Sequence, residues 1–305
     1  MIKKELNKLD FKGNILTDID VGKTTAFKTK ALCNYFIEPF DLKSLSILVK
    51  YLKKKNEDFF ILGGGYNTLI KTNGIKIIIS FKRFFHKFGL VKETKNEVYL
   101  NVQAGAMLQK ICWHCAIKGY QGLNSLIGIP GTIGGAVFMN AGTKKGDIFS
   151  VIEEVLLMDY SGEQFKAAKN EILPSYRELK LKTDKKFIIL GCTLKLLKTN
   201  SEKLVKEAKK LLVERKNSQP LNEKSCGCFF KNPESSPAGM LIDKTGLKDK
   251  RIGGARVSNL HGNFIISEEG CTALDIIKLK ELIQKKVKNK FDLTLEPEVK
   301  IVGRD

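Results

Sequence analysis

The first third of the chain alternates between amphipathic stretches and short apolar runs. After Asp41, apolar residues recur with a helical period, which predicts a helix capped by that aspartate. Its apolar face consists of Leu42, Leu45, Leu48, Val49 and Leu52. Apolar runs at 59–62, 75–81 and 98–102 predict strands. A second amphipathic helix is expected after Gly105, with an apolar side made of Leu108, Ile111, Cys112 and Cys115.

The rest of the chain continues this mixture of helices and strands. Strands are expected at 151–159 and 187–197, separated by Pro-Ser-Tyr-Arg at 174–177. A helix capped by Ser201 should end near 217–220, where we place a domain boundary. Its apolar residues are Leu204, Val205, Ala208, Leu211 and Leu212. A last long helix is expected from a Thr272 cap through Val287, so the pattern predicts a mixed fold throughout.

Composition narrows the class of protein. With 305 residues and 43% hydrophobic residues, the chain should form two or three domains with real cores. It has no apolar run of about 18 residues, so we expect no membrane insertion. The first six residues lack the apolar stretch of a signal peptide. Seven cysteines scattered along the chain favour reduced thiols, so the expected location is the cytoplasm.

The net charge of +20 invites a nucleic-acid interpretation, but the pattern does not favour it. Lysines are spread over nearly every segment and fall on the polar sides of the expected helices. No zinc finger, RNA-binding motif or basic stripe with interleaved aromatic residues occurs. We therefore expect no nucleic-acid partner. A positive surface would still attract small anions such as nucleotide diphosphates.

Two glycine-rich segments carry the strongest chemical signal. The fifteen residues Gly128–Gly142 contain Gly128, Gly131, Gly134, Gly135 and Gly142. Such a density of glycine makes both a helix and a strand unfavourable, whereas bare backbone amides can contact a large ligand closely. A second cluster, Gly63–Gly65, follows an expected strand. Neither segment is a P-loop or a Rossmann motif. Together they predict a phosphate-bearing cofactor held at both ends.

The Cys-Trp-His-Cys sequence at 112–115 resembles a redox or metal motif. Cys112 and Cys115, however, share the apolar face of the expected helix, and no second cysteine pair has zinc-site spacing. We therefore interpret both thiols as core residues and predict no metal site.

Nine motifs, taken in order, resemble the UDP-N-acetylenolpyruvoylglucosamine reductase family from about residue 25 to the C-terminus. They are L-G-G-G-Y-N-T-L, G-I-P-G-T-I-G-G-A-V-F-M-N-A-G, P-S-Y-R, R-x-x-x-Q-P, C-G-C-F-F-K-N-P, A-G-M-L-I-D-K-T-G-L-K, I-G-G-A-x-V-S, H-G-N-F-I and L-E-P-E-V-K-I-V-G. The resemblance implies a cytoplasmic flavoenzyme of peptidoglycan precursor synthesis. The expected fold is α+β, with two FAD-gripping subdomains of the vanillyl-alcohol-oxidase (PCMH) type and a C-terminal substrate-binding domain. The corresponding boundaries are 1–82, 83–213 and 214–305.

The same resemblance assigns the cofactors and the residues that contact FAD. NADPH would give a hydride to FAD, and the enolpyruvyl group of a UDP-sugar would then take it at C3. The expected FAD-binding residues are Gly63, Gly64, Gly65, Asn67, Thr68, Gly128, Ile129, Pro130, Gly131, Thr132, Gly134, Gly135, Asn140, Ala141 and Gly142.

Transfer to C3 would build negative charge at C2 and on the attached carboxylate, so a cation and an acid are needed. The resemblance gives the cation as Arg177, whose guanidinium can hold a carboxylate at two points. It gives Glu298 as the second electrostatic residue, with Glu296 as the alternative. The acid position is Cys228, where the family usually has serine. A thiol has an ordinary pKa of ~8.5, so it is mostly protonated at neutral pH and can act as an acid.

Further residues are expected to bind the substrate or to hold its domain together. Tyr176, Arg215, Lys231 and Asn232 are the substrate-binding candidates. His261 and Asn263 match the family too, and a structural role is open for both. The 51 residues from Arg177 to Cys228 leave no room for the tyrosine-bearing insertion of one subclass, so the chain resembles the shorter subclass.

The chain also departs from the family pattern. Lys30-Ala31 replaces a common Gly-Gly pair, Tyr66 stands where serine is common, and Asn124 replaces a common glutamate. Two alternatives therefore stay open: an FAD oxidoreductase with another anionic substrate, and a non-enzymatic basic protein that binds nucleic acid. We expect a monomer.

Overall fold

The structure, a computed structural model, describes residues 2–182 and 186–304. The chain divides into two compact units. Unit 1 comprises Met1–Thr17, Tyr35–Gly64 and Lys76–Val213, and unit 2 comprises Asp18–Asn34, Gly65–Ile75 and Glu214–Asp305. Each unit has its own hydrophobic core.

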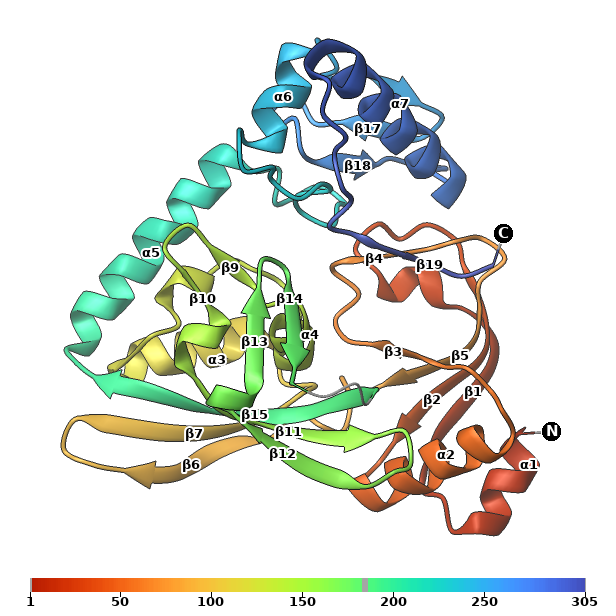
Figure 1. Ribbon diagram of the computed structural model, residues 1–305, viewed down its shortest axis with the longest axis vertical. Coiled ribbons are helices and arrows are strands. Elements are labelled where there is room, and N and C mark those ends of the chain that lie inside the picture. The colour runs from red at the N-terminus through yellow and green to blue at the C-terminus, as the bar shows by residue number, and fades with distance from the viewer. Residues whose placement is uncertain (1, 183–185, 305) are drawn as a thin grey trace. The chain divides into compact units, whose positions relative to one another are not determined.

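Unit 1 contains a six-stranded antiparallel sheet (Figure 1). Its strands, in spatial order, are β12 (Gln164–Ala168), β11 (Ile152–Asp159), β15 (Phe187–Lys198), β7 (Glu97–Gln103) and β6 (Phe88–Glu93), and β8 (Tyr120–Gln121) also pairs with β15. The strands predicted at 98–102, 151–159 and 187–197 are confirmed within one residue of their ends.

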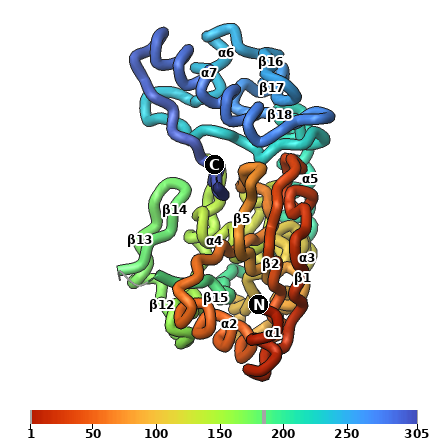
Figure 2. The backbone as a smooth tube through the Cα atoms, turned by 90° about the vertical axis from the view of Figure 1, so that its right-hand side faces the viewer, coloured from red at the N-terminus to blue at the C-terminus, as the bar shows by residue number. Residues whose placement is uncertain are grey.

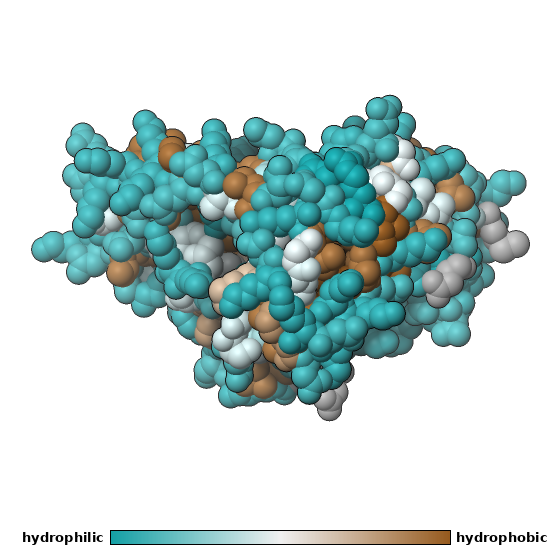
Figure 3. Space-filling view, turned by 90° about the horizontal axis from the view of Figure 1, so that it is seen from above, coloured by the Kyte–Doolittle hydropathy of each residue, from teal (hydrophilic) through white to brown (hydrophobic). Residues whose placement is uncertain are grey.

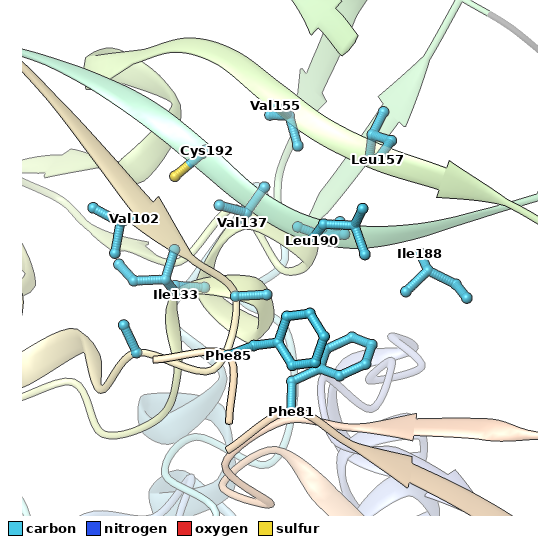
Figure 4. Close-up of a cluster of buried hydrophobic side chains, with 14 of the residues drawn as sticks. Phe81, Phe85, Val102, Ile133, Val137, Val155, Leu157, Ile188, Leu190 and Cys192 are labelled. Atoms are coloured by element: carbon cyan, nitrogen blue, oxygen red, sulfur yellow. The ribbon is translucent and has the colours of Figure 1, made fainter. Parts of the chain in front are cut away.

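One face of this sheet is covered by the helices α3 (Leu108–Lys118) and α4 (Ile133–Phe138). Figure 4 shows Ile133 and Val137 of α4 against Leu190 and Cys192 of β15. Cys112 and Cys115 of α3 are each 1% exposed, so their assignment to the core is confirmed. Burial raises the pKa of the Cys115 thiol to about 12, which makes a reactive thiolate unfavourable there.

The N-terminal region contributes the helix α1 (Ile2–Leu6) and a four-stranded sheet. The strand order is β1 (Gly13–Asp20), β2 (Leu32–Pro39), β5 (Ile75–Ser80) and β3 (Phe60–Leu62). The helix α2 (Leu42–Lys54) begins where predicted, because the Asp41 carboxylate accepts a hydrogen bond from the Ser44 amide at 2.7 Å. Its predicted apolar face is buried at Leu45, Leu48, Val49 and Leu52.

Unit 2 is built mainly from α-helices of its C-terminal part, a small antiparallel sheet and a parallel strand pair. The helices are α6 (Ala238–Lys244) and α7 (Ala273–Phe291), and the sheet comprises β16 (Arg251–Ile252), β17 (Ala255–Val257) and β18 (Ile265–Ser267). In the parallel pair, β4 (Thr68–Ile70) lies beside β19 (Lys300–Val302). Thr272 caps α7 as predicted, but the helix continues one turn beyond Val287.

Two expectations need correction, and a hairpin lies between two of the expected strands. The glycine-rich run contains a helix, α4, because Thr132 caps its first turn and its apolar residues are buried against the sheet. The helix α5 (Ser201–Ser218) begins at Ser201, but its cap is Asn200, whose Oδ1 accepts a hydrogen bond from the Lys203 amide at 2.9 Å. The segment at 174–177 belongs to a hairpin formed by β13 (Ile172–Ser175) and β14 (Glu178–Leu181), with Tyr176 and Arg177 as its turn. This hairpin projects from the main sheet of unit 1 (Figure 2).

The remaining strands, β9 (Gly142–Thr143) and β10 (Gly146–Asp147), form a second hairpin at the end of the glycine-rich run. The surface seen in Figure 3 is mainly hydrophilic, as expected for a chain with 28% charged residues. Within residues 2–182 and 186–304, no helix has the length and apolar character needed to cross a membrane.

Unit 2 also has an ion-pair network around Arg256, which is 8% exposed and pairs with three partly exposed carboxylates. The Arg256 guanidinium donates to Glu268 at 2.7 Å, Asp249 at 3.1 Å and Glu223 at 2.6 Å. We expect Arg256→Ala to lower the free energy of unfolding by about 2 kcal/mol, because the packing of a buried side chain is lost and the carboxylates of Glu223 and Asp249 lose this cation. Urea unfolding checks this value.

Arg251→Ala is the matched control, because Arg251 pairs with the same Glu268 from a side chain that is 56% exposed. Its expected cost is under about 1 kcal/mol. Equal losses in the two variants would contradict the structural role of this network.

Candidate functional site

The two glycine-rich segments meet within unit 1. A Cβ atom added to Gly63 would lie 2.9 Å from the Thr132 Oγ1 and 3.8 Å from the Gly135 Cα. Only glycine at position 63 permits this approach without displacing Thr132. The end of β3 is therefore packed against the first turn of α4, although Thr132 follows Gly63 by 69 positions in the sequence.

The Gly-Ile-Pro-Gly part of the run is held by a residue that the sequence analysis missed. The Gln109 Nε2 donates to the carbonyl oxygens of Leu126 at 3.0 Å and Ile129 at 2.6 Å. The Gln109 Oε1 accepts a hydrogen bond from the Gly128 amide at 2.8 Å. Gln109 belongs to α3, so its side chain fixes this loop to a helix of the core. No motif marks such a contact in the sequence.

The glycines of the run have different structural roles. A Cβ at Gly134 would lie 2.8 Å from the Ala104 Cβ, and one at Gly142 would lie 2.5 Å from the Asp147 Cβ, so both are needed for packing. Gly131 has a φ of +125° and open space around a Cβ position. A Cβ at Gly135 would lie 3.6 Å from the Thr132 Oγ1 and would contact no other described atom outside its own helix within 4 Å. Gly131 and Gly135 therefore leave room beside the backbone for a ligand.

Two backbone amides at the start of α4 donate hydrogen bonds to other residues of unit 1. The Ile133 amide donates to the Ala106 carbonyl oxygen, and the Gly134 amide donates to the Ala104 carbonyl oxygen, both at 2.8 Å. These two amides fix α4 to the connection between β7 and α3. An FAD molecule would consequently depend on other amides of the glycine-rich segments.

Arg177 occupies the turn of the β13–β14 hairpin. Ser175 and Glu178 pair across the hairpin, which leaves Tyr176 and Arg177 as the two turn residues. Arg177 has a left-handed φ of +61°. Its guanidinium carbon lies 4.8 Å from the centre of the Tyr176 ring, within the range of a cation–π contact. The turn thus presents an aromatic ring and a cation together.

The second part of the first glycine segment belongs to unit 2. A Cβ at Gly65, whose φ is +72°, would lie 2.4 Å from the Thr24 carbonyl oxygen. The Asn67 Nδ2 donates to the Glu298 carbonyl oxygen at 3.1 Å. Thr68 begins β4 and pairs with Lys300 of β19. The segment Gly65–Thr68 is therefore fixed directly beside Glu298.

Cys228 and Glu298 lie on neighbouring backbone segments of unit 2. The Glu298 amide donates to the Phe229 carbonyl oxygen at 2.8 Å, and Phe230 forms a bridge with Pro297. The Cys228 side chain is partly exposed, and the Oε2 atom of Glu298 is buried. Unit 2 thus brings two of the three predicted catalytic residues onto adjacent segments.

Cys226 differs from Cys228 in its surroundings. It is 9% exposed and belongs to the core of unit 2, and its Sγ lies 3.8 Å from the Thr68 carbonyl oxygen. Burial raises the pKa of the Cys226 thiol far above its ordinary value. Cys226 is therefore a packing residue.

The other residues near Cys228 form contacts inside unit 2. The Lys231 ammonium lies 2.9 Å from Glu296 and lowers the pKa of that exposed carboxyl. The Asn232 Oδ1 accepts a hydrogen bond from the Ala238 amide at 3.0 Å. Arg215 is half-buried in the last turns of α5. Because Glu296 pairs with Lys231 at the surface, the geometry favours Glu298 as the acidic site residue.

Asn263 has a structural role. It is 1% exposed, its Oδ1 accepts from the Phe230 amide at 2.9 Å, and its Nδ2 donates to the Phe230 carbonyl oxygen at 2.8 Å. The His261 Nδ1 accepts a hydrogen bond from the Asn263 amide at 3.2 Å. These contacts hold the segment that follows Cys228 in place.

The glycine-rich region of unit 1 fits a flat, phosphate-bearing cofactor. The open positions at Gly131 and Gly135 are cradles that a side chain would otherwise fill. Thr132 and Gly63 lie immediately beside them. Such a bare backbone surface is suited to close contact with FAD.

Comparison with known proteins supports the same assignment. Residues 33–168 match the FAD binding domain family, and residues 219–302 match the C-terminal domain of UDP-N-acetylenolpyruvoylglucosamine reductase. The reductase of that name from Desulfosudis oleivorans is 35% identical, with 96% of each chain covered. The one from Clostridium botulinum strain 657 is 36% identical over 96% of this chain and 94% of its own length.

Among solved structures, the UDP-N-acetylenolpyruvylglucosamine reductase of Thermus caldophilus superimposes with a TM-score of 0.78 at 27% identity. The match covers 95% of this chain and 99% of the Thermus chain. The predicted α+β class with an FAD-binding domain is therefore confirmed.

Proposed function

This chain belongs to the UDP-N-acetylenolpyruvoylglucosamine reductase family, and on that premise we propose its reaction and the residues that perform it. The protein reduces UDP-N-acetylglucosamine enolpyruvate to UDP-N-acetylmuramate with NADPH, in the synthesis of peptidoglycan precursors. The observation that carries this assignment is the similarity to reductases of that name over 96% of the chain.

The protein binds FAD through its glycine-rich segments. Bound FAD supplies the hydride chemistry between NADPH and C3 of the enolpyruvyl group. Gly63, Gly131 and Gly135 provide the bare backbone surface, and Gln109 holds the Gly128–Ile129 loop in the required conformation. Asn67 and Thr68 follow on the same segment as Gly63.

Arg177 stabilises the negative charge that develops during the reduction. Its guanidinium can form two parallel hydrogen bonds with the substrate carboxylate, which a lysine ammonium cannot do in the same geometry. The contact with Tyr176 restricts the arginine to one side of the turn. Tyr176, Arg215, Lys231 and Asn232 are the residues we assign to binding of the UDP-sugar.

Cys228 donates the proton to C2, and Glu298 completes the electrostatic environment. A neutral thiol is a stronger acid than the serine hydroxyl that the family usually has at this position. The partial exposure of Cys228 gives the substrate access to it, in contrast with the buried Cys226. Support for Glu298 comes from its backbone, which is fixed to both Asn67 and Phe229.

Initial-rate kinetics test the reaction itself. With NADPH and the enolpyruvyl UDP-sugar varied together, parallel double-reciprocal lines and one product molecule per NADPH oxidised are expected. NADPH oxidation without formation of UDP-N-acetylmuramate, identified by mass spectrometry, would refute the substrate assignment.

Gly135→Ala tests the place of the cofactor. The added methyl group has ordinary contact with the Thr132 Oγ1 at 3.6 Å, so the apoprotein should be as stable as the wild type or gain up to about 1 kcal/mol from helix propensity. The same methyl group fills the open space, so FAD affinity should fall roughly tenfold or more, about 1.4 kcal/mol. Isothermal titration of apoprotein with FAD measures this.

Gly134→Ala is the neighbouring control. Its methyl group would lie 2.8 Å from the Ala104 Cβ, so it should lower the free energy of unfolding by about 1–3 kcal/mol. FAD affinity that is unchanged in Gly135→Ala would place the cofactor elsewhere.

The different exposure of the cysteines predicts that alkylation of the native protein is selective. All seven cysteines lie in the described part of the chain, and six of them are buried. We expect iodoacetamide to modify Cys228 first, with loss of reductase activity at the same rate. Peptide mapping by mass spectrometry checks the site, and Cys228→Ser should keep its activity under the same treatment. Inactivation of Cys228→Ser at the wild-type rate would show that another thiol is responsible.

We also propose that the enzyme is a cytoplasmic monomer. Its seven cysteines are present as thiols, which is usual in a reducing compartment. Light scattering after size-exclusion chromatography should give a mass near 34.2 kDa.

A further inference from the structure

Asn140 closes the glycine-rich run in an unusual conformation. Its φ is +38°, in the left-handed region that asparagine adopts more readily than most residues. Its side chain is buried, with 6% exposure, next to the short hairpin of β9 and β10. A buried amide needs hydrogen-bond partners, and the partners of Asn140 indicate its role.

Both donor positions of the Asn140 amide are used inside unit 1. The Asn140 Nδ2 donates to the Asp147 Oδ2 and to the Ser175 carbonyl oxygen, each at 3.3 Å. The Asn140 Oδ1 accepts a hydrogen bond from the Phe149 amide at 3.3 Å. A side-chain amide has only two N–H donors, so these contacts leave no Nδ2 hydrogen for a cofactor. The FAD-binding role predicted for Asn140 from the sequence stays a prediction.

The contact with Ser175 reaches the hairpin that carries Arg177. Ser175 is the last residue of β13 and directly precedes the turn residues Tyr176 and Arg177. A two-stranded hairpin has little stability of its own, so its orientation depends on contacts with the rest of the protein. Asp147 is itself fixed, because its Oδ1 accepts the Ser150 amide at 3.1 Å. Asn140 therefore connects the base of the turn to a fixed element.

We propose that Asn140 is a positioning residue for Arg177. By holding the Ser175 carbonyl oxygen, it fixes the turn from which the guanidinium reaches the substrate carboxylate. The inference rests on the role of Arg177 in the proposed function. Displacement of a reacting group by about 1 Å can cost a hundredfold in rate, so a lost anchor should affect the chemical step.

The first test uses Asn140→Gly, because glycine accepts the left-handed φ and only the side chain is removed. In stopped-flow experiments with FAD-loaded protein, flavin reduction by NADPH should stay within about twofold of the wild type. The limiting rate of flavin reoxidation by the enolpyruvyl UDP-sugar should fall roughly 10–100-fold. The substrate concentration at half-maximal rate should change much less, because other residues hold the nucleotide.

Asn124→Ala is the matched control. Asn124 is also a buried asparagine of unit 1, at 8% exposure, and its Nδ2 donates to the Leu204 carbonyl oxygen and to Glu207. Within the described residues, both of these partners belong to α5 and not to the hairpin of Arg177, so the reoxidation rate of Asn124→Ala should stay near the wild-type value. Should Asn140→Gly fold poorly, Asn140→Asp serves instead. It keeps the side-chain size, loses both donors, and should show the same split between reduction and reoxidation.

A double-mutant comparison separates positioning from a general structural effect. If Asn140 acts through Arg177, adding Asn140→Gly to Arg177→Ala should lower the reoxidation rate no further than Arg177→Ala alone. Amide hydrogen exchange of residues 172–181 should be faster in Asn140→Gly than in the wild type, with no substrate present.

Independent, multiplicative losses in the double variant would overturn the proposal, and so would unchanged hydrogen exchange in the hairpin. A selective fall in FAD affinity with normal reoxidation at saturating FAD would return Asn140 to cofactor binding. Wild-type enzyme whose reduced flavin the substrate does not reoxidise would refute the proposed function and the catalytic consequence with it. In that case the hydrogen-exchange result still decides whether Asn140 anchors the hairpin.

Discussion

Replacing Cys228 with alanine should greatly slow one half of the reaction and spare the other. NADPH should reduce the flavin of Cys228→Ala at nearly the wild-type rate, because that step needs no proton donor at C2. Reoxidation of the flavin by the enolpyruvyl UDP-sugar should slow by about 10²–10⁴-fold, the usual contribution of a general acid. Stopped-flow absorbance of the flavin measures both rates on the same protein.

Cys228→Ser is the informative companion, since serine is the residue that the family usually has there. It should retain a measurable reoxidation rate and resist iodoacetamide. Equal loss of both half-reactions in Cys228→Ala would show that Cys228 maintains the structure of unit 2. The nearby Cys226→Ala variant provides the structural reference, because Cys226 is buried in the core of that unit.

Removal of the Arg177 guanidinium should have the second large effect. Arg177→Ala should lower the limiting rate of flavin reoxidation by about 10²–10³-fold, because the developing negative charge loses its stabilising donor. Arg177→Lys should recover only part of this rate, since an ammonium keeps the charge without the two-pronged geometry. Reduction by NADPH should remain normal in both variants.

The comparison between lysine and alanine at position 177 distinguishes charge from shape. Full recovery in Arg177→Lys would mean that a positive charge alone suffices. A loss confined to substrate affinity, with an unchanged limiting rate, would assign Arg177 to binding alone. Far-UV circular dichroism should be unchanged in both variants, because the side chain lies in a turn.

The regular elements could be predicted because each has a local signal. Asp41 and Thr272 are capping residues followed by apolar residues at helical spacing, and both cap their helices. The apolar run at 187–197 gives β15, a central strand of the six-stranded sheet. Cys112 and Cys115 were assigned to the core from their position on one helical face, and burial confirms this.

The two errors about helices have different causes. Glycines at 134 and 135 disfavour a helix locally, yet Thr132 caps α4 and burial of Ile133 and Val137 stabilises it. The cap of α5 is Asn200 and not the predicted Ser201. These adjacent residues have similar capping strength, so the sequence alone does not decide which of them caps the helix.

The sequence predicts the site residues that belong to motifs, but it does not predict the residues that support them. Order and spacing of the motifs identify Arg177, Cys228 and Glu298, whose roles stay predictions. Gln109 and Asp147 belong to no motif, and their contacts with the loop at Gly128 and with Asn140 depend on the folded chain. Packing also gives Gly134 and Gly135 different roles that the sequence does not show. A Cβ at Gly134 would lie too close to Ala104, whereas one at Gly135 has room.

The most direct test of the central claim is an anaerobic titration of the purified, FAD-loaded protein. NADPH should bleach the flavin absorbance, and only the enolpyruvyl UDP-sugar should restore it, in equal molar amounts. Flavin that bleaches with NADPH and does not recover on addition of this substrate would contradict the assignment. A protein that cannot be loaded with FAD would contradict the cofactor as well.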